Sequence, residues 1–393
     1  MAISQLKEPN STVTTKILPQ ELIIEILSWL PPHHLYPFKS VSKNWLNLLT
    51  TDPHFANLHY NRLIQSNTNP SILALRKKTW MRRSNVSLAI DFSSCDQSTD
   101  LEVPFHVGSL GSYKVHGIHN GLLCLSCDDD DIYVWNPFTK DYVTIPCPEF
   151  VLFSFCGYKK SSSYGFGYDQ ESKDYKVVSV WSESNYATSD FHSYVSVYTL
   201  GTDEWRVIDE DVPYNLTLST GSPVVGGVLH WLTCKTGAFD ECIIVAFDMK
   251  DEIFREMLPP DEVKFGDGIG ELGGLLCIFC GHVEKHVEIW AMRKYGVVDS
   301  WAKQYKIGKP EVCGSFYYLE PVGIVAQSGE VIVKKNLTEI ILYDPKCNSV
   351  SEPKDLGFES TEVYAFVGSI ISPRVISGQA CHDVDEETRT RER

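Results

Sequence analysis

The chain has 393 residues and a formal net charge of −16, and 43% of its residues are hydrophobic, which is enough for a small unit and a larger one with a full core. No apolar run approaches the roughly 18 residues of a membrane span, and the first 15 residues lack the apolar region of a secretory signal. We therefore expect a protein of the cytoplasm or the nucleus, with no membrane partner and with 12 cysteines as free thiols.

The charge is unevenly distributed along the chain. Residues 1–85 hold ten Lys/Arg and four Asp/Glu, a balance of +6, whereas the remainder holds 25 and 47, a balance of −22. This asymmetry indicates two units with different partners. The acidic second unit argues against nucleic acid as a partner, because phosphates require Lys and Arg.

The segment 20–30 predicts an amphipathic helix that ends at Pro31-Pro32. Its apolar residues recur at the spacing of one helical face: Leu22, Ile23, Ile26, Leu27 and Leu30. A second helical stripe follows at Phe38, Val41, Trp45 and Leu48. Two or three short helices bury too little apolar surface to be stable alone. Periodicity leaves two hypotheses open, a cap on the larger unit or a docking element for another protein.

The order of residues in this region resembles the F-box, in the form found in the large plant family of F-box proteins. The matching pattern is LP at 18–19, LIIEILSWLP, FKSVSK, Trp45 and DPHF at 52–55. The resemblance implies a trihelical module that binds a Skp-type adaptor and, through it, a cullin scaffold. It also implies which residues form the adaptor interface and the small core beneath it: Leu18, Pro19, Leu22, Ile23, Ile26, Leu27, Leu30, Leu35, Phe38, Val41 and Trp45.

Pro37 departs from the family pattern, in which Arg usually precedes the Phe-Lys pair. Proline lacks an amide hydrogen and is tolerated at the start of a helix but not in its interior. We therefore expect the second helix to begin at Pro37 and the affinity for the adaptor to be altered.

The basic run RKKTWMRR at 76–83 is interpreted as a solvated connector, with a nuclear-localisation patch as the alternative. The expected organisation is a disordered N-terminus at 1–14, an F-box at 15–60, a linker at 61–84, a β-domain at 85–376 and a disordered tail at 377–393.

The β-domain reads as a repeat of short alternating runs broken by Gly, Pro, Asn and Asp. Marker aromatics lie 63, 49, 43 and 53 residues apart, at Trp135, Tyr198, Phe247, Trp290 and Tyr343. This period predicts an all-β propeller of about six blades, with a large β-sandwich as the alternative. We expect residues 361–372 to pair with an early strand such as 85–92, which would close the ring.

The motifs GIHNGLLCL, VWNPFTKDYVTIP, YGFGYDQESKDYKVVSV and VGGVLHWL closely resemble the plant F-box-associated domain, which is described as kelch-like. Together with the F-box, this resemblance covers almost the whole chain. The fold class implied is α+β multidomain, a small helical F-box followed by a kelch-like propeller.

Two CxxC pairs have the residue types of a metal site. They are Cys124/Cys127 and Cys277/Cys280, and the second pair is followed by His282 and His286. Residues three apart on a strand point to opposite faces, so we expect buried free cysteines and no metal.

Two further motifs also favour structural roles. The GxGxxG match at 268–273 leads into a strand rather than a helix, which predicts a turn and no cofactor. Asp128–Asp131 lacks the spaced ligands of a calcium loop and predicts a solvated hairpin tip.

The combined interpretation is a non-catalytic substrate-recognition subunit of an SCF-type ubiquitin ligase, with no cofactor. The F-box would bind the adaptor and the propeller would bind an unidentified target protein, and Asp- and Glu-rich loops favour a basic target. Two alternatives remain, a propeller enzyme with a site in its central channel and an F-box scaffold that acts outside a ligase.

Overall fold

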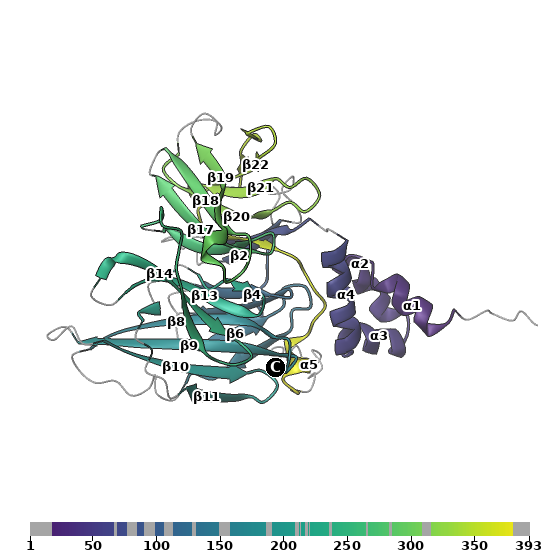
Figure 1. Cartoon of the computed structure of the whole chain (residues 1–393). Coiled ribbons are helices and arrows are strands. Elements are labelled where there is room, and N and C mark those ends of the chain that lie inside the picture. Colours follow the sequence, from purple (N-terminus) through teal and green to yellow (C-terminus); the bar gives the residue numbers. More distant parts are fainter. Residues whose placement is uncertain are drawn as a thin grey trace, which may run out of the picture.

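The computed structural model describes residues 18–66, 69–76, 85–89, 99–105, 113–127, 131–148, 158–185, 191–208, 212, 214–216, 219, 221–235, 238–264, 266–282, 285–308 and 316–379. A helical module lies beside a larger body made of six antiparallel sheets (Figure 1). The N-terminus 1–14 and the part of the tail beyond residue 379, both expected to be disordered, lie outside the described residues. No helix in the described part of the chain has the length and apolar character needed to cross a membrane.

The helical module contains α1 (Gln20–Leu27), α2 (Pro32–Leu35), the 3-10 helix η1 (Tyr36–Ser40), α3 (Lys43–Thr50) and α4 (Pro53–Gln65). Polar side chains begin the two longer helices after η1. The Ser42 hydroxyl accepts a hydrogen bond from the Trp45 amide at 3.2 Å, and the Asp52 carboxylate accepts one from the Phe55 amide at 3.0 Å. These caps satisfy backbone amides that have no partner within the helix.

The expected continuous stripe from Phe38 to Leu48 is interrupted. Pro37 is the second residue of η1, which begins at Tyr36, so the prediction that an α-helix begins at Pro37 is wrong. The chain then becomes extended at Ser42 before α3 begins. A proline is compatible with the first turn of a short 3-10 helix, and the capping serine starts a new helix rather than continuing the old one.

The sheets, each given from its innermost strand outward, have the following members. The first is β25 (Ser360–Phe366), β1 (Ser71–Arg76), β2 (Asn85–Ala89) and β3 (Thr99–Asp100), and the second is β4 (Tyr113–His119), β5 (Leu122–Cys127), β6 (Ile132–Trp135) and β7 (Tyr142–Ile145). The third is β8 (Tyr158–Asp169), β9 (Asp174–Asn185), β10 (Phe191–Thr199) and β11 (Glu204–Ile208), and the fourth is β12 (Val224–Val225), β13 (Val228–Lys235), β14 (Ala238–Asp248) and β15 (Phe254–Met257). The fifth is β16 (Gly268–Leu272), β17 (Leu275–His282), β18 (His286–Met292) and β19 (Trp301–Gly308), and the 3-10 helix η5 (Val298–Ser300) lies just before β19. The sixth is β20 (Leu319–Ile324), β21 (Val331–Lys335), β22 (Glu339–Asp344) and β23 (Ser349–Val350), and the short strand β24 (Lys354–Asp355) also pairs with β22. A short helix, α5 (Pro373–Ile376), follows β25.

The repeat read from the sequence corresponds to one position in the blades. The marker aromatics occupy the third strand of five sheets, on β6, β10, β14, β18 and β22, and all are buried: Trp135, Tyr198, Phe247, Trp290 and Tyr343. Large aromatic side chains at this position fill the space between neighbouring sheets. The propeller is confirmed, and the β-sandwich alternative is wrong.

The C-terminal strand closes the ring, but with a different partner from the one expected. β25 pairs with β1, where Leu73 lies opposite Tyr364, and β1 rather than β25 pairs with 85–89. β1 lies inside the segment 61–84 that was expected to be a linker, and α4 continues to Gln65. Leu73 and Leu75 on β1 are fully buried, because this strand is covered by sheets on both faces. The domain boundary therefore lies earlier than the sequence indicated.

The helical module packs directly on the propeller. Phe55 and Ala56 at the start of α4 belong to the same apolar cluster as Tyr175, Ile370 and Ile371 of the propeller. α4 lies between the propeller and the pair α1 and α3 (Figure 1). Since a continuous apolar cluster joins the two units, the helices are held in a fixed orientation on the blades.

Candidate protein-interaction surfaces

Helix α1 presents a row of apolar side chains that nothing in the described chain covers. Leu18, Leu22 and Ile26 are four residues apart and are 47%, 49% and 55% exposed. Leu27, adjacent to this row, is only 2% exposed and packs in the core. Residues four apart lie on one side of a helix, so Leu22 and Ile26 share one side of α1. Together with the exposed Leu18, which precedes the helix, they are called the exposed stripe.

The structure separates two roles that the sequence had left together. Of the eleven residues expected at the adaptor interface and its core, Leu27 and Leu35 are buried. Four are partly buried against the core: Ile23, Leu30, Phe38 and Trp45. The remaining five are exposed: Leu18, Pro19, Leu22, Ile26 and Val41. Only the exposed and partly buried members can contact a partner without unfolding the module.

Four exposed apolar residues of the module were missed in the sequence: Trp29, Tyr36, Leu46 and Ile64, at 50%, 68%, 42% and 50% exposure. Trp29 follows Ile26 by three residues, so helical spacing could have found it. Eight of the sixteen large apolar residues exposed in the described chain lie within 18–66. Such a concentration is typical of a surface that binds another protein.

Arg62 on α4 fixes α1 in place. Its guanidinium lies 2.6 Å from the Glu25 carboxylate and donates to the Glu25 carbonyl at 3.1 Å and to the Ser28 hydroxyl. The same group lies 4.9 Å from the centre of the Trp29 ring. The hydrogen bond from Arg62 lowers the pKa of Glu25. One side chain of α4 therefore positions the end of the exposed stripe.

His59 makes a second link, from α4 to the turn that follows α1. Its Nε2 lies 2.7 Å from the carbonyl oxygen of Leu30, and the residue is fully buried. Burial lowers the pKa of His59, so the neutral ring donates this hydrogen bond. The turn after α1 is thereby tied to the helix that rests on the propeller.

A central channel of about 950 Å³ runs through the propeller and is lined by the innermost strands. One end is lined by Tyr60 and Ile64 of α4. Burial, followed by the charge of Glu271, raises the pKa of Tyr60 to about 12. Glu271 lies near the end of β16, just before the turn to β17, so α4 lies at the hairpin end of the inner strands.

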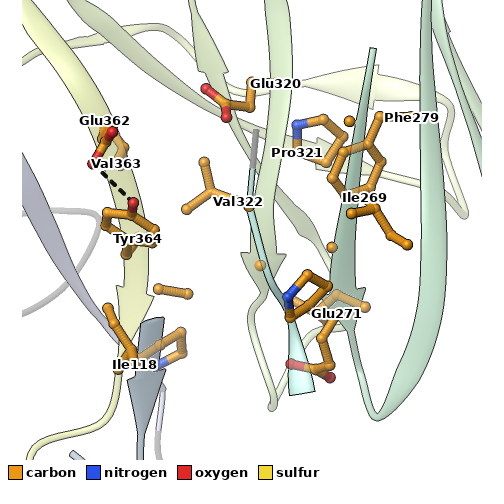
Figure 2. Close-up of a pocket in the computed structure, with 18 of the residues that line it drawn as sticks. Ile118, Ile269, Glu271, Phe279, Glu320, Pro321, Val322, Glu362, Val363 and Tyr364 are labelled. Atoms are coloured by element: carbon orange, nitrogen blue, oxygen red, sulfur yellow. Dashed lines mark hydrogen bonds between the residues drawn. The ribbon is translucent and has the colours of Figure 1, made fainter. Parts of the chain in front are cut away.

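The opposite end of the channel contains the beginnings of the inner strands. Glu320 is the second residue of β20 and Glu362 the third of β25, and the Val115 amide near the start of β4 lies 3.4 Å from Glu362. Figure 2 shows Glu271 and Glu320 toward opposite ends of the close-up, with Val322 between them. Tyr317 and Tyr318, 55% and 42% exposed, also line this second end.

Family models of known proteins match the two segments of the chain that carry these surfaces. The family model of the F-box domain matches residues 16–56, and that of the F-box associated beta propeller domain matches residues 77–350. The chain belongs to the F-box proteins with an F-box-associated β-propeller. The exposed stripe thus lies on the F-box, and the channel lies in the F-box-associated domain.

Relatives of similar organisation occur in Arabidopsis thaliana. The F-box protein CPR1 is 30% identical over 85% of this chain and 83% of its own length. The F-box/kelch-repeat protein At3g23880 is 26% identical over 86% of this chain and 93% of its own length. Among solved structures, the six-bladed fungal lectin of Aleuria aurantia aligns with a TM-score of 0.43 at 10% identity, over 75% of this chain and 95% of its own. F-box proteins with an F-box-associated propeller are generally non-catalytic substrate adaptors.

The second CxxC pair of the F-box-associated domain does not form a single metal site. Cys277 and Cys280 on β17 belong to different apolar clusters, on opposite faces of the sheet. Burial raises the pKa of each thiol to about 12. Neutral buried thiols at opposite faces cannot share a metal ion, as the strand periodicity predicts.

Two other expectations can be compared with the structure. The GxGxxG match forms β16 and a turn at Gly273-Gly274, whose φ angles of 61° and 82° favour glycine, and β17 follows directly. Gly273 therefore serves a turn, whereas Gly268 and Gly270 lie within the strand. Most of the acidic run Asp128–Asp131 lies outside the described residues.

His282 and His286 face each other across the β17–β18 hairpin, with ring centres 4.3 Å apart. With Glu288 they could offer metal ligand atoms that lie within 4.8 Å of one another. Glu288, however, already lies 2.8 Å from Lys303 and 3.7 Å from Lys306. The two ammonium groups oppose a further cation at this place.

Proposed function

We propose that this F-box protein is the substrate-recognition subunit of an SCF-type ubiquitin ligase, acting in the cytoplasm or the nucleus. The exposed apolar stripe at Leu18, Leu22 and Ile26 carries this proposal. It lies in the segment that matches the F-box, and it has no cover in the described chain. Because these side chains are already about half buried, burying the remainder of each against an adaptor would contribute about 1 kcal/mol.

The proposed mechanism requires no reacting group from this chain. The F-box would hold the adaptor and cullin, the propeller would hold a target protein, and proximity would raise the rate of ubiquitin transfer. The apolar cluster between α4 and the propeller supports this role, because it fixes the distance between the two binding surfaces. The links of Arg62 and His59 to α1 extend that rigidity to the exposed stripe.

A pull-down with a purified Skp-type adaptor tests the proposal. Wild type should recover the adaptor, and the double variant Leu22→Asp/Ile26→Asp should lose it, because two buried charges cannot be solvated in an apolar interface. The matched control is Val207→Asp/Leu258→Asp, which changes two propeller residues that are each 53% exposed. Equal recovery by wild type and both variants contradicts the proposal.

A second measurement separates the ligase subunit from the scaffold alternative. When the adaptor is supplied in complex with cullin, the full-length chain should recover both proteins. Recovery of the adaptor with exclusion of cullin would favour an F-box scaffold that acts outside a ligase.

A further inference from the structure

Among the described residues, helix α4 lines one end of the central channel, and the opposite end, which no described helix lines, is called the open end. Tyr60 and Ile64 of α4 line the end beside the F-box. The other end, around Tyr317, Tyr318 and Glu320, lies at the starts of the inner strands, away from α4. A partner bound in the channel therefore enters from the face opposite the F-box, which leaves the adaptor surface free.

The walls of this channel are apolar in the middle and acidic toward the ends. The apolar side chains labelled in Figure 2 include those of Ile118, Ile269, Phe279, Pro321, Val322 and Val363. The described lining residues also include four carboxylates, at Asp267, Glu271, Glu320 and Glu362, and no Lys or Arg. An apolar channel whose charged lining residues are all carboxylates favours a ligand that combines apolar surface with positive charge.

The neighbours of these carboxylates offset the cost of burial only in part. The Tyr364 hydroxyl donates to Glu362 at 2.9 Å (Figure 2), and the charge of Lys114 also favours the ionised form. Burial outweighs both and raises the pKa of Glu362. Lys334 lies 3.5 Å from Glu320. A cation brought by a ligand would relieve the remaining desolvation of Glu362.

Two of the four lining histidines, His116 and His119, add no positive charge to the channel at neutral pH. His116 is buried and its Nε2 lies 2.8 Å from the Ser126 hydroxyl. Burial lowers the pKa of His116 to about 3 and that of His119 to about 4. Both rings are therefore neutral and do not offset the charge of the carboxylates.

The size and the open end suit a segment of a protein. A volume of about 950 Å³ is near the upper end for small-molecule pockets and holds several side chains. Tyr317 and Tyr318 stand exposed at the open end, and tyrosine rings attract guanidinium and ammonium groups. Aromatic rings are also enriched where proteins bind one another.

Resting on the proposed role as a receptor, we infer that the open end of the channel, bounded by Tyr318, Glu320 and Glu362, binds a target segment that carries a lysine or arginine flanked by apolar residues. The basic side chain enters between the carboxylates, and the flanking residues contact the apolar wall. This assignment makes the acidic charge of the propeller a determinant of specificity at a defined place.

The test selects random peptides displayed on phage against the full-length chain in complex with its adaptor. Selected peptides should show Lys or Arg at one fixed position. A fluorescent peptide from the selection should bind wild type and lose about tenfold or more in affinity on Glu320→Gln/Glu362→Gln. Replacing its Arg by the neutral isostere citrulline should cause the same loss.

The matched control is Glu102→Gln/Glu171→Gln, which neutralises two exposed propeller carboxylates outside the channel lining and should bind the peptide as wild type does. Selection without basic residues, no selected peptide, or equal binding by the channel variant overturns the inference. Binding of arginine amide alone, with the same dependence on Glu320 and Glu362, would overturn it in favour of a small organic cation. Adaptor recovery measured on the same samples keeps this outcome separate from the proposed function, which fails if wild type does not recover the adaptor or if the Leu22→Asp/Ile26→Asp variant recovers it equally well.

Discussion

Leu22 and Leu27 lie five residues apart on the same short helix and have opposite environments: Leu22 is 49% exposed and Leu27 is 2% exposed. The exposed leucine belongs to the uncovered stripe of α1, and the buried one belongs to the cluster that joins the F-box to the propeller. One helix thus supplies both a docking surface and the core that holds it in place.

Replacing each of these two leucines by alanine in turn should separate effects on adaptor binding from effects on the stability of the fold. Leu27→Ala should lower the free energy of unfolding by about 2–5 kcal/mol, since it leaves a cavity in the core. Leu22→Ala should change it by less than about 0.5 kcal/mol while weakening the adaptor complex. Urea unfolding and adaptor titration of the two variants make the comparison. Equal loss of stability would contradict the assignment of Leu22 to the outer face.

Replacement of Arg62 should loosen α1 without unfolding the propeller. Arg62→Ala removes hydrogen bonds to the Glu25 carbonyl and the buried Ser28, and should cost about 1–3 kcal/mol. Little of this comes from the ion pair itself, because the Glu25 side chain is 54% exposed. Hydrogen exchange of α1 amides should report the change. Lys140→Ala, which breaks a fully solvent-facing pair, is the control and should leave stability nearly unchanged.

Asn136 should be required for closure of the propeller. Its side-chain amide donates to the carbonyls of Ser369 and Ile371 at 3.0 and 2.7 Å, and its Oδ1 accepts from the Phe138 amide at 2.8 Å. Asn136→Ala leaves these buried groups unpaired and should destabilise the domain by about 2–4 kcal/mol. Asn136→Asp should also destabilise it, since a carboxylate cannot donate to two carbonyls. Limited proteolysis after β25 should then be faster; unchanged cleavage would contradict this role.

Because of the buried histidines, the free energy of unfolding should decrease as the pH is lowered. Burial lowers the pKa of His116 to about 3 and that of His230 to about 4. As pH falls below about 6.5, the unfolded chain takes up protons that the native rings do not, so each ring can cost up to about 1.4 kcal/mol per pH unit. Urea midpoints at about pH 7 and about pH 5.5 should therefore differ.

The comparison must use variants as well as wild type. The raised pKa values of Glu271 and Glu362 act in the opposite direction, since those native groups bind protons before the unfolded chain does. His116→Gln and His230→Gln should each reduce the acid-induced loss of stability. An unchanged pH dependence in both variants would show that these rings do not determine it.

The sequence alone determined the elements that depend on local spacing. Helical periodicity found α1, and the recurrence of Trp135, Phe247 and Trp290 found the blades, because each blade repeats the same buried position. The strand period also predicted that Cys277 and Cys280 face apart. These features follow from how side chains alternate along a helix or a strand.

Only the tertiary structure decided the features that depend on distant contacts. β1 was hidden next to a basic run, and its partner β25 lies at the other end of the chain. Leu22 and Leu27 both fit an apolar stripe, and only packing on the propeller shows which is exposed. Glu271, Glu320 and Glu362 come from three different blades, so no local pattern could indicate that they share a channel. The closed ring decides which remote segments pair and which side chains become buried between them, and local periodicity cannot predict these contacts.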